Sequence, residues 1–209
     1  MVEKCLVVPR KALFGNDDKY AFSGFRTKDE WKVDLESVLS KDAFYAPRKT
    51  LNKEDDVEYQ EDLKQIIPGV VFLYKNKIFT YSRLDGSGEK RMVGRNDILI
   101  SGHVEPQDTK KTYQKTLWNA LHREFNEEMI YRHSYSLDHI GYVNLDDDLL
   151  GKVHFGLVYL IPGSSPEISV KETEKHQGSL KTAQEISQLQ PPLMSWHNII
   201  FDEVKKYLK

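Results

Sequence analysis

A short charged segment near the middle of the chain carries the clearest chemical signal in the sequence. Residues 123–128 read REFNEE and follow a stretch with apolar residues at helical spacing. On a helix with about 100° per residue, Glu124, Glu127 and Glu128 share an arc of about 100° that continues the apolar face upstream. The sequence therefore predicts a helix with three carboxylates on the side that faces the core.

Three carboxylates so close together need a compensating positive charge. Two like charges about 6 Å apart repel by roughly 3 kcal/mol at an effective dielectric constant near 20, and partial burial adds a desolvation cost. A divalent cation that prefers hard oxygen ligands would neutralise them, which points to Mg²⁺ or Mn²⁺. A solvated helix end, with its acids paired to Arg123 and Arg132, is the alternative, and the segment by itself leaves both interpretations open.

The same segment resembles the core of the Nudix box, whose pattern is Gly, five residues, Glu, seven residues, Arg-Glu-hydrophobic-any-Glu-Glu, any, Gly and hydrophobic. Gly102 matches the first position, Asp108 stands in place of the first Glu, and residues 123–128 match the core without exception. Fourteen residues separate Asp108 from Arg123, and Ile130 replaces the final Gly. Seven extra residues shift the helical phase by only about 20°, but Ile130 resists the left-handed conformation that ends such a helix, so this helix must end differently.

Short segments outside the box strengthen the likeness to a MutT-like subgroup of Nudix proteins called predicted phosphoesterases. They are residues 65–68, 81–83, 102–103, 151–158, 172 and 195–196. The likeness covers roughly residues 63–209. It implies an α+β protein with a Nudix-type α/β/α sandwich and a mixed sheet. Residues 1–62 would then be an N-terminal extension packed on a Nudix domain of residues 63–209, which ends in a C-terminal helix.

The resemblance implies a metal-dependent hydrolase, a pyrophosphohydrolase or phosphoesterase, that cleaves a nucleoside diphosphate linked to another group. Glu124 and Glu128 would be the main metal ligands, and Glu127 a further ligand or a base. Arg123 would orient the acids, and the backbone at Gly102 would lie close to the metal, where a Cβ would crowd it.

Four further residues are candidates for the site that the resemblance implies. Glu172 follows a predicted strand where the family often carries a fourth acid, although a solvated Lys-Glu loop is the simpler interpretation. Arg83 and Arg91 belong to or flank the sheet expected to face the substrate, where either could bind phosphate. His103 is next to Gly102, in a loop that must pass near the metal, and is a candidate substrate contact.

A non-catalytic Nudix-fold module, which binds a nucleotide or a protein partner, is the alternative function. The long spacer and Ile130 favour it. The intact Arg123, Glu124, Glu127 and Glu128 favour a hydrolase, because a pure binder need not keep four charges clustered on a core-facing arc.

Composition limits the other classes of partner. The chain of 209 residues has 30 Lys and Arg against 32 Asp and Glu, a formal net charge of -2, so no nucleic-acid partner is expected. The single Cys5 excludes a disulfide framework and a Cys-based zinc site. No stretch approaches the roughly 18 apolar residues of a membrane span, and a cytoplasmic protein is expected. Aromatic residues in the N-terminal region, Trp31, Phe44 and Tyr45, predict a homodimer.

Hydrophobic periodicity gives a coarse order of elements, with strands before and after a central helix and helices at the end. The predicted strands are residues 5–8, 66–74, 78–84, 97–101, 137–143, 152–161 and 168–170, and the predicted helices are 28–39, 112–129, 181–189 and 195–208.

Overall fold

The computed structural model describes residues 2–84, 94–147, 149–193 and 195–208. The chain separates into two compact units. Unit 1 comprises Met1–Pro68, Ser101–His122 and Ile140–Leu157, and unit 2 comprises Gly69–Ile100, Arg123–His139 and Val158–Lys209. Each unit is therefore assembled from three separate stretches of chain. The predicted division at residue 62 stays a prediction.

Among the described residues, ten strands join one mixed sheet, whose main path has the order β12-β5-β4-β10-β9-β2. Its strands are β1 (Glu3–Pro9), β2 (Gly24–Thr27), β3 (Phe44–Arg48), β4 (Leu63–Tyr74), β5 (Lys77–Arg83), β6 (Asn96–Asp97), β7 (Ile100–Ser101), β9 (Asp138–Asn144), β10 (His154–Pro162) and β12 (His176–Thr182). A small second sheet pairs β8 (Met129–Tyr131) with β11 (Ile168–Val170).

The helices of the described residues are mostly short. The α-helices are α1 (Arg10–Phe14), α2 (Leu35–Asp42), α3 (Tyr113–Glu128), α4 (Leu149–Val153), α5 (Ala183–Ser187) and α6 (Ser195–Val204). Single 3₁₀ turns are η1 (Asn16–Asp18), η2 (Lys53–Asp55), η3 (Val57–Tyr59), η5 (Pro106–Asp108) and η6 (Lys205–Tyr207). Helix α3 is the longest of these, as the sequence predicted.

In unit 1, strand β1 is hydrogen-bonded on both sides. It runs antiparallel to β3, with Cys5 opposite Ala46, and antiparallel to β4, with Val7 opposite Gln65. Its alternate residues Cys5 and Val7 belong to a buried apolar group that also contains Ala46, Val57 and Leu63. The N-terminal residues therefore contribute strands and core side chains to this unit.

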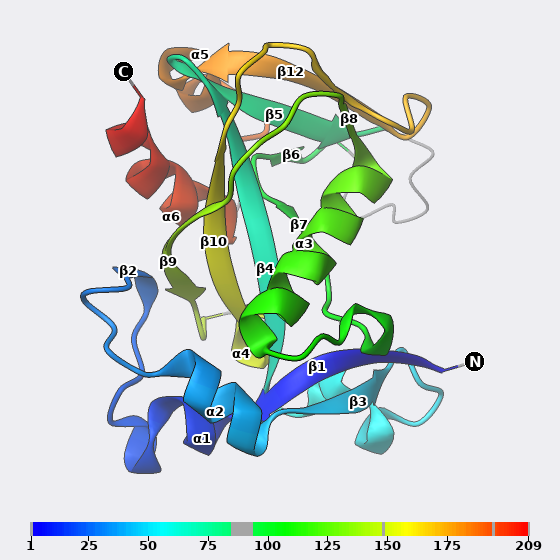
Figure 1. The fold of residues 1–209 in the computed structure, drawn as a ribbon, viewed down its shortest axis with the longest axis vertical. Helices are drawn as coiled ribbons and strands as arrows, with labels where there is room; N and C mark the ends of the chain where they lie inside the picture. The colour runs from blue at the N-terminus through cyan, green and yellow to red at the C-terminus, as the bar shows by residue number, and fades with distance from the viewer. Residues whose placement is uncertain (1, 85–93, 148, 194, 209) are drawn as a thin grey trace. The chain divides into compact units, whose positions relative to one another are not determined.

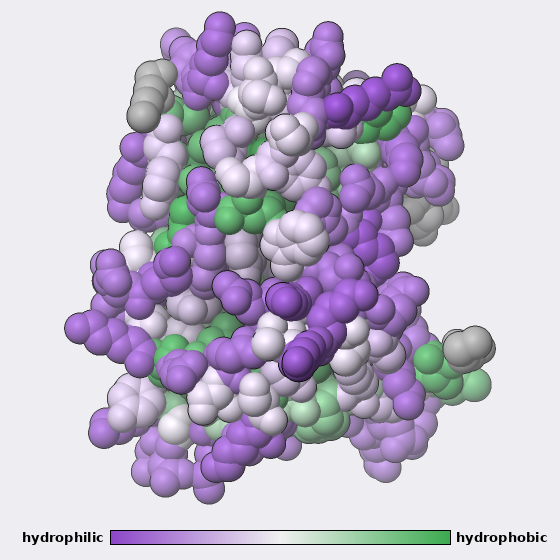
Figure 2. Space-filling model, viewed as in Figure 1, coloured by the Kyte–Doolittle hydropathy of each residue, from purple (hydrophilic) through white to green (hydrophobic). Residues whose placement is uncertain are grey.

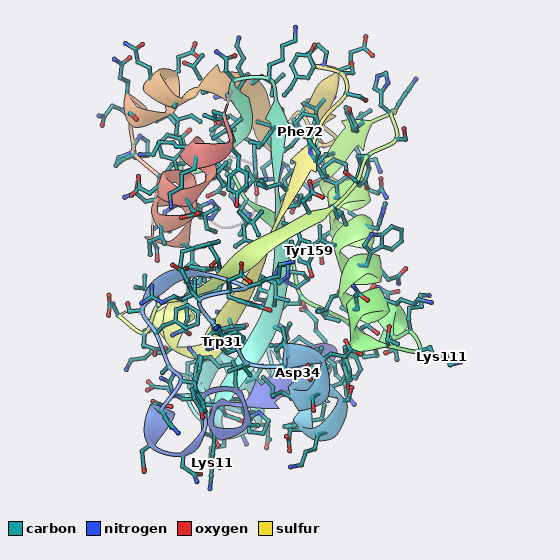
Figure 3. All side chains as sticks on the ribbon, turned by 60° about the vertical axis from the view of Figure 1, so that its left-hand side comes forward. Lys11, Trp31, Asp34, Phe72, Lys111 and Tyr159 are labelled. Atoms are coloured by element: carbon teal, nitrogen blue, oxygen red, sulfur yellow. The ribbon has the colours of Figure 1, made fainter. Side chains whose placement is uncertain are left out.

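Unit 1 also contains a cluster of aromatic rings around Trp31, which Figure 3 labels. The Trp31 ring centroid lies 4.7 Å from that of Tyr142 and 5.2 Å from that of Phe155, and Phe14 packs edge-on against Phe155 at 5.8 Å. Trp31 is only 5% exposed. It therefore cannot offer the apolar dimer surface that the sequence suggested for it, although Phe44 is 46% exposed.

In unit 2, β5 lies between β4 and β12, and β6 also pairs with β5 (Figure 1). The hairpin that joins β4 to β5 has Leu73 opposite Ile78, and this confirms the predicted hairpin. Strand β12 runs antiparallel to β5 with Ser179 opposite Thr80. Tyr81 on β5 faces Asp97 on β6, so this end of the sheet carries polar residues.

The surface drawn in Figure 2 is mostly hydrophilic, with hydrophobic residues showing in small groups between the hydrophilic ones. The described helices include none that is long and apolar enough to cross a membrane.

Candidate functional site

The three predicted carboxylates lie in the last turns of α3. Phe125, between them, is buried at 1% exposure and anchors this part of the helix. The Glu124 side chain is 16% exposed and that of Glu127 is 58% exposed, while Glu128 is half-buried. Glu124 and Glu128 therefore face inward as the sequence predicted, and Glu127 lies at the edge of the arc.

The long spacer of the motif is largely helical. Residues 113–122 form the first turns of α3, so the same helix carries the spacer and the acids. Its first turn receives a side-chain cap from α2, where the Glu36 carboxylate accepts 2.9 Å hydrogen bonds from the backbone N–H groups of Tyr113 and Gln114. A carboxylate at a helix N-terminus also interacts favourably with the helix dipole. The additional residues thus lengthen the helix and leave the acids on one continuous element.

The end of α3 explains how the chain tolerates Ile130 where the Nudix box has glycine. The helix passes directly into strand β8, and Ile130 pairs with Ser169 of β11. A β-branched residue suits an extended conformation, so the left-handed glycine turn is not needed here. The prediction that this helix ends differently is confirmed.

Arg123 bridges two of the carboxylates. Its Nη1 donates to Glu124 Oε1 at 2.8 Å and to Glu127 Oε2 at 3.2 Å. The Arg123 side chain is itself only 16% exposed, so it holds both carboxylates from a poorly solvated position. This arrangement fits the orienting role that the resemblance implied for Arg123.

The surroundings of Glu128 strongly perturb its carboxyl group. Burial, and then the neighbouring Glu124 carboxylate, raise the pKa of Glu128 to about 7, although Arg83 acts in the opposite direction. Near neutral pH this carboxyl group is therefore only partly ionised. A bound cation would lower this raised pKa, since positive charge stabilises the carboxylate form.

Arg83, predicted as a substrate contact, lies at the end of β5 in the same unit. Its Nε is 3.7 Å from Asp97 Oδ2, and this buried N–H makes no hydrogen bond within the described residues. The side chain keeps 28% of its area exposed. An unsatisfied buried donor is costly, so this guanidinium is suited to an anion that would complete its bonding.

Three further polar residues near the acids were not predicted from the sequence: Tyr81, Asp97 and His197. Burial, and then the negative charges of Glu128 and Asp97, raise the pKa of Tyr81 well above its usual value. His197 Nδ1 accepts from the Ile98 N–H at 3.2 Å, which places the ring proton on Nε2, 3.4 Å from Asp97 Oδ1. Only the pairing of β6 with β5 and the packing of α6 bring these residues together, and no spacing in the sequence shows it.

Glu172 follows β11, in a loop attached to the end of α3. The Lys171 N–H donates to the Glu128 carbonyl oxygen at 2.8 Å, and Lys171 Nζ donates to the Asn126 carbonyl at 2.6 Å. The Glu172 carboxylate pairs with Lys175 Nζ at 3.0 Å. The structure thus places the backbone next to Glu172 beside the acidic helix end, while its role stays a prediction.

The other predicted residues belong to unit 1 or fall outside the described residues. Gly102 and His103 belong to unit 1, where His103 Nε2 and Gln65 Oε1 are 2.9 Å apart. Asp108 is 1% exposed and accepts a 2.9 Å hydrogen bond from the Glu105 N–H, so it caps the 3₁₀ turn η5. Arg91 lies outside the described residues. The metal contact of Gly102 and the substrate contacts of His103 and Arg91 stay predictions.

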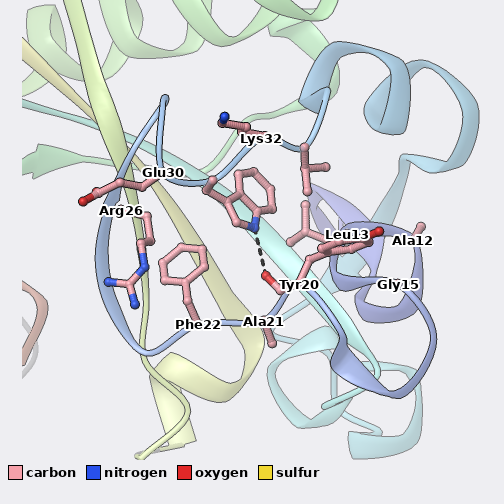
Figure 4. A pocket seen from close by; sticks show the side chains of 11 residues that line it. Ala12, Leu13, Gly15, Tyr20, Ala21, Phe22, Arg26, Glu30 and Lys32 are labelled. Atoms are coloured by element: carbon pink, nitrogen blue, oxygen red, sulfur yellow. Dashed lines mark hydrogen bonds between the residues drawn. The ribbon is translucent and has the colours of Figure 1, made fainter.

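An open pocket of about 590 Å³ lies in unit 1 (Figure 4). Its lining residues include Tyr20, Phe22 and Trp31, and Trp31 Nε1 donates a 3.0 Å hydrogen bond to the Tyr20 carbonyl at its wall. Its polar lining includes Arg26 and Glu30. The acids of α3 are not among its lining residues.

Comparison with known proteins defines the class of fold. No family model matches the chain. The chain is 27% identical over 209 residues to protein YmaB of Bacillus subtilis (strain 168), and the match covers 97% of each chain. Among solved structures, it resembles Tm1382, a Nudix hydrolase candidate, with a TM-score of 0.77 and 24% identity over 99% of this chain and 100% of that one.

A second solved structure supports the same class. The Nudix domain of Shewanella oneidensis NrtR, crystallised with ADP-ribose, superposes with a TM-score of 0.53 and 14% identity, over 70% of this chain and 89% of that one. These likenesses show that the chain has the Nudix fold, an α+β fold with a large mixed sheet, which confirms the predicted fold class.

Proposed function

We propose that this protein is a Nudix-type hydrolase that cleaves the phosphoanhydride bond of a nucleoside diphosphate linked to another group, using Mg²⁺ or Mn²⁺. The single observation that carries the proposal is the partly buried acid cluster at the end of α3. Its Glu128 has a pKa raised to about 7 by burial and by Glu124. The Nudix fold and the unbroken match of residues 123–128 to the motif core support the same conclusion.

The donor set suits a hard divalent cation. Glu124, Glu127 and Glu128 offer carboxylate oxygens, which Mg²⁺ and Mn²⁺ prefer over nitrogen or sulfur ligands. When bound there, the ion would neutralise charge on the phosphates and lower the pKa of a coordinated water. Arg123 would fix the directions of Glu124 and Glu127 through the bridge it already makes.

The chain's own residues supply the remaining tasks of such a reaction. The buried Nε–H of Arg83 would donate to a phosphate oxygen of the substrate. His197 would keep Asp97 oriented beside Arg83, because its Nε2–H points at that carboxylate. Glu172 would take the proton of the attacking water, from the loop next to the helix end. Arg91 stays a predicted phosphate contact.

ADP-ribose, which NrtR binds, belongs to the proposed substrate class.

The second candidate function is a nucleotide-binding module without activity, and one observation favours it. Asp108, which stands at the first acidic position of the motif, is buried and used as a cap. The two functions differ in one property, which is turnover with bound metal. The cytoplasmic location stays a prediction.

A panel assay tests the proposal. Nucleoside diphosphate compounds, including nucleoside diphosphate sugars and dinucleotides, are incubated with the protein and either Mg²⁺ or Mn²⁺, and the products are separated by chromatography. We expect metal-dependent cleavage of at least one compound. Either metal should also raise the melting temperature of the wild type but not that of Glu128→Gln. Nucleotide binding without cleavage of any compound would support the binding module instead.

A further inference from the structure

A second group of metal-ligating side chains lies in unit 1, outside the acidic cluster. It consists of Glu58 in the turn η3, His103 in the loop after β7, and His154 at the start of β10. Each offers one ligand atom, and these atoms all lie within 4.8 Å of one another. The rings of His103 and His154 have centroids 5.6 Å apart. Three distant parts of the chain thus bring two imidazoles and a carboxylate to one place.

The histidine ring of His154 is buried and held by a defined hydrogen bond. Only 8% of the residue is exposed, and its Nδ1 lies 2.6 Å from the Leu150 carbonyl oxygen. A carbonyl oxygen can only accept, so Nδ1 carries the proton and Nε2 has the lone pair of a neutral imidazole. Burial also lowers the pKa of His154, which favours the neutral form. Such a backbone-bonded imidazole is the usual form of a metal-ligating histidine.

His103 is oriented by a side-chain amide. Its Nε2 lies 2.9 Å from Gln65 Oε1, and the Cys5 thiol donates to the same oxygen at 3.4 Å. With the amide oxygen as acceptor, Nε2 of His103 is the donor and Nδ1 has the lone pair. Gln65 is fully buried on β4, so this orientation is set by the sheet.

Glu58 has its own supporting partner. One carboxylate oxygen, Oε1, accepts from Arg48 Nε at 3.1 Å and from Arg48 Nη2 at 2.9 Å. Arg48 also pairs with Glu3, so its positive charge is shared between two carboxylates. All three ligands therefore have an outer hydrogen bond that fixes their direction, which is typical of built metal sites.

The other charged group near the cluster is also paired. Lys64 Nζ lies 3.3 Å from the His154 carbonyl oxygen, but it forms an ion pair with Asp146 at 2.6 Å. Lys64 and Arg48 both act to lower the pKa of His154, whereas Glu58 acts to raise it. Lys64 and Arg48 are thus each paired with carboxylates, and Glu58 would be the carboxylate in contact with a bound ion.

We propose that Glu58, His103 and His154 bind a divalent transition-metal ion of the Zn²⁺ class. Two imidazole nitrogens and one carboxylate oxygen are ligands that Zn²⁺, Co²⁺ and Ni²⁺ accept and that Mg²⁺ does not favour. The site therefore differs in metal preference from the all-carboxylate cluster of α3. A metal ion bound here would link Glu58 of η3 to the loop at residue 103 and to β10. Bound metal would therefore stabilise unit 1. This assigns His103 to a metal site in place of a substrate contact.

The experiment uses the full chain freed of metal, with Zn²⁺ and Co²⁺ as separate probes. Calorimetry should give one strong Zn²⁺ site per chain that excess Mg²⁺ does not displace. The Co²⁺ form should show visible absorption bands of low-coordinate cobalt with nitrogen ligands. His154→Gln, His103→Gln and Glu58→Gln should each weaken Zn²⁺ binding by about 100-fold or more.

Two control variants separate this site from other metal binding. His133→Gln removes an exposed histidine that pairs with Glu167, and it should bind Zn²⁺ like wild type. Glu128→Gln should also keep this Zn²⁺ site, because that residue belongs to the α3 cluster. Equal Zn²⁺ affinity in wild type and in folded His103→Gln would overturn the proposal. If the variants do not fold, X-ray absorption of the wild-type Zn²⁺ form decides, since a spectrum without two imidazole ligands overturns the proposal as well.

Discussion

The backbone N–H of Lys171 donates a 2.8 Å hydrogen bond to the carbonyl oxygen of Glu128. This bond continues the pairing of β8 with β11 and fixes the loop that carries Glu172 to the last residue of α3. Lys171 Nζ also donates to the carbonyl oxygen of Asn126, 45 positions away in sequence, so the loop is held next to the helix end. The loop at Glu172 is placed by backbone hydrogen bonding and not by its charged side chains alone.

We expect Glu172→Gln to lower kcat of the proposed hydrolysis by about 100-fold, because a general base contributes about 10² to 10⁴ in rate. KM should change little, since the substitution keeps the size of the side chain and leaves the Lys171 backbone bond in place. Glu174→Gln, two residues further on, is the matched control. Equal rates for the two variants would make Glu172 a surface residue of the loop.

Glu128 should make the metal-free protein less stable as pH rises. Its folded-state pKa of about 7 lies above the usual value of 4.5, so the folded state binds the extra proton between these two values. The associated stability is present below about pH 4.5 and is lost as pH rises through 7, by roughly 3 kcal/mol at most. Denaturant unfolding in the presence of a chelator, at steps between pH 5 and pH 8, measures this slope.

Glu128→Gln is neutral at every pH and should remove most of that slope. At pH 8 without metal, the variant should therefore be more stable than wild type, although it has lost the metal site. The surface variant Glu54→Gln should keep the wild-type slope. A wild-type stability that is flat or rises across this range would contradict the assignment of a buried, partly protonated Glu128.

The three acids of α3 should act as one catalytic unit. Replacing Glu124 or Glu128 by Gln should cost about 10² or more in kcat, roughly 2.7 kcal/mol of transition-state stabilisation. Glu127→Gln should cost less than these, because Glu127 is the most exposed of the three. The double variant of Glu124 and Glu128 should be little worse than either single one. Rates that multiply independently, in variants with native circular dichroism, would refute a shared centre.

Much of the fold and of the acid cluster could be predicted from the sequence. The hairpin of β4 and β5 and the strand β11 follow from short β-branched runs between polar turns, and both are confirmed. Helix α3 was predicted within one residue at each end, because its apolar spacing is regular over sixteen residues. The inward direction of Glu124 and Glu128 followed from the same periodicity.

The remaining features depend on tertiary contacts that local patterns do not encode. Residues 176–182 form the strand β12, although they contain no apolar run, because β5 offers them an open edge. The predicted helix from residue 28 begins only at Leu35, where Asp34 caps it by accepting from the Ser37 N–H. The approach of His197 to Asp97 joins residues 100 positions apart. Trp31 was expected to offer apolar surface and is enclosed by the rings of Phe14, Tyr142 and Phe155.

A homodimer remains a prediction, now resting on exposed apolar residues of unit 1. Phe44 and Leu51 line a surface hollow of about 950 Å³. Phe44 is 46% exposed and Leu51 is fully exposed. Light scattering at micromolar concentration should give twice the chain mass of 24.3 kDa. Phe44→Glu should give the monomer mass, because a charge in an apolar interface is costly. Leu149→Glu, at another exposed apolar residue, is the control, and a wild-type monomer would dispose of the dimer.

The ion pair of Lys64 and Asp146 should be a strong contributor to the stability of unit 1. Lys64 has no exposed surface, and its Nζ donates to Asp146 Oδ1 at 2.6 Å and to the Gly151 carbonyl at 2.7 Å. Arg10 donates to both oxygens of the same carboxylate. Although burial acts to raise the pKa of Asp146, hydrogen bonds from Arg10 and Lys64 lower it to about 2.

We therefore expect Asp146→Asn to destabilise the protein by roughly 2–4 kcal/mol near neutral pH, because it leaves the buried Lys64 ammonium without its counter-charge. The pKa of Asp146 is lowered on folding, so its contribution is present above about pH 4 and is lost as pH falls through 2. The difference between wild type and variant should shrink over that interval. The exposed neighbour Asp147→Asn is the control, and adding Lys64→Met to Asp146→Asn should recover part of the loss. Denaturant unfolding monitored by tryptophan fluorescence measures all four proteins. If Asp146→Asn costs no more than Asp147→Asn, the ion pair contributes nothing to stability.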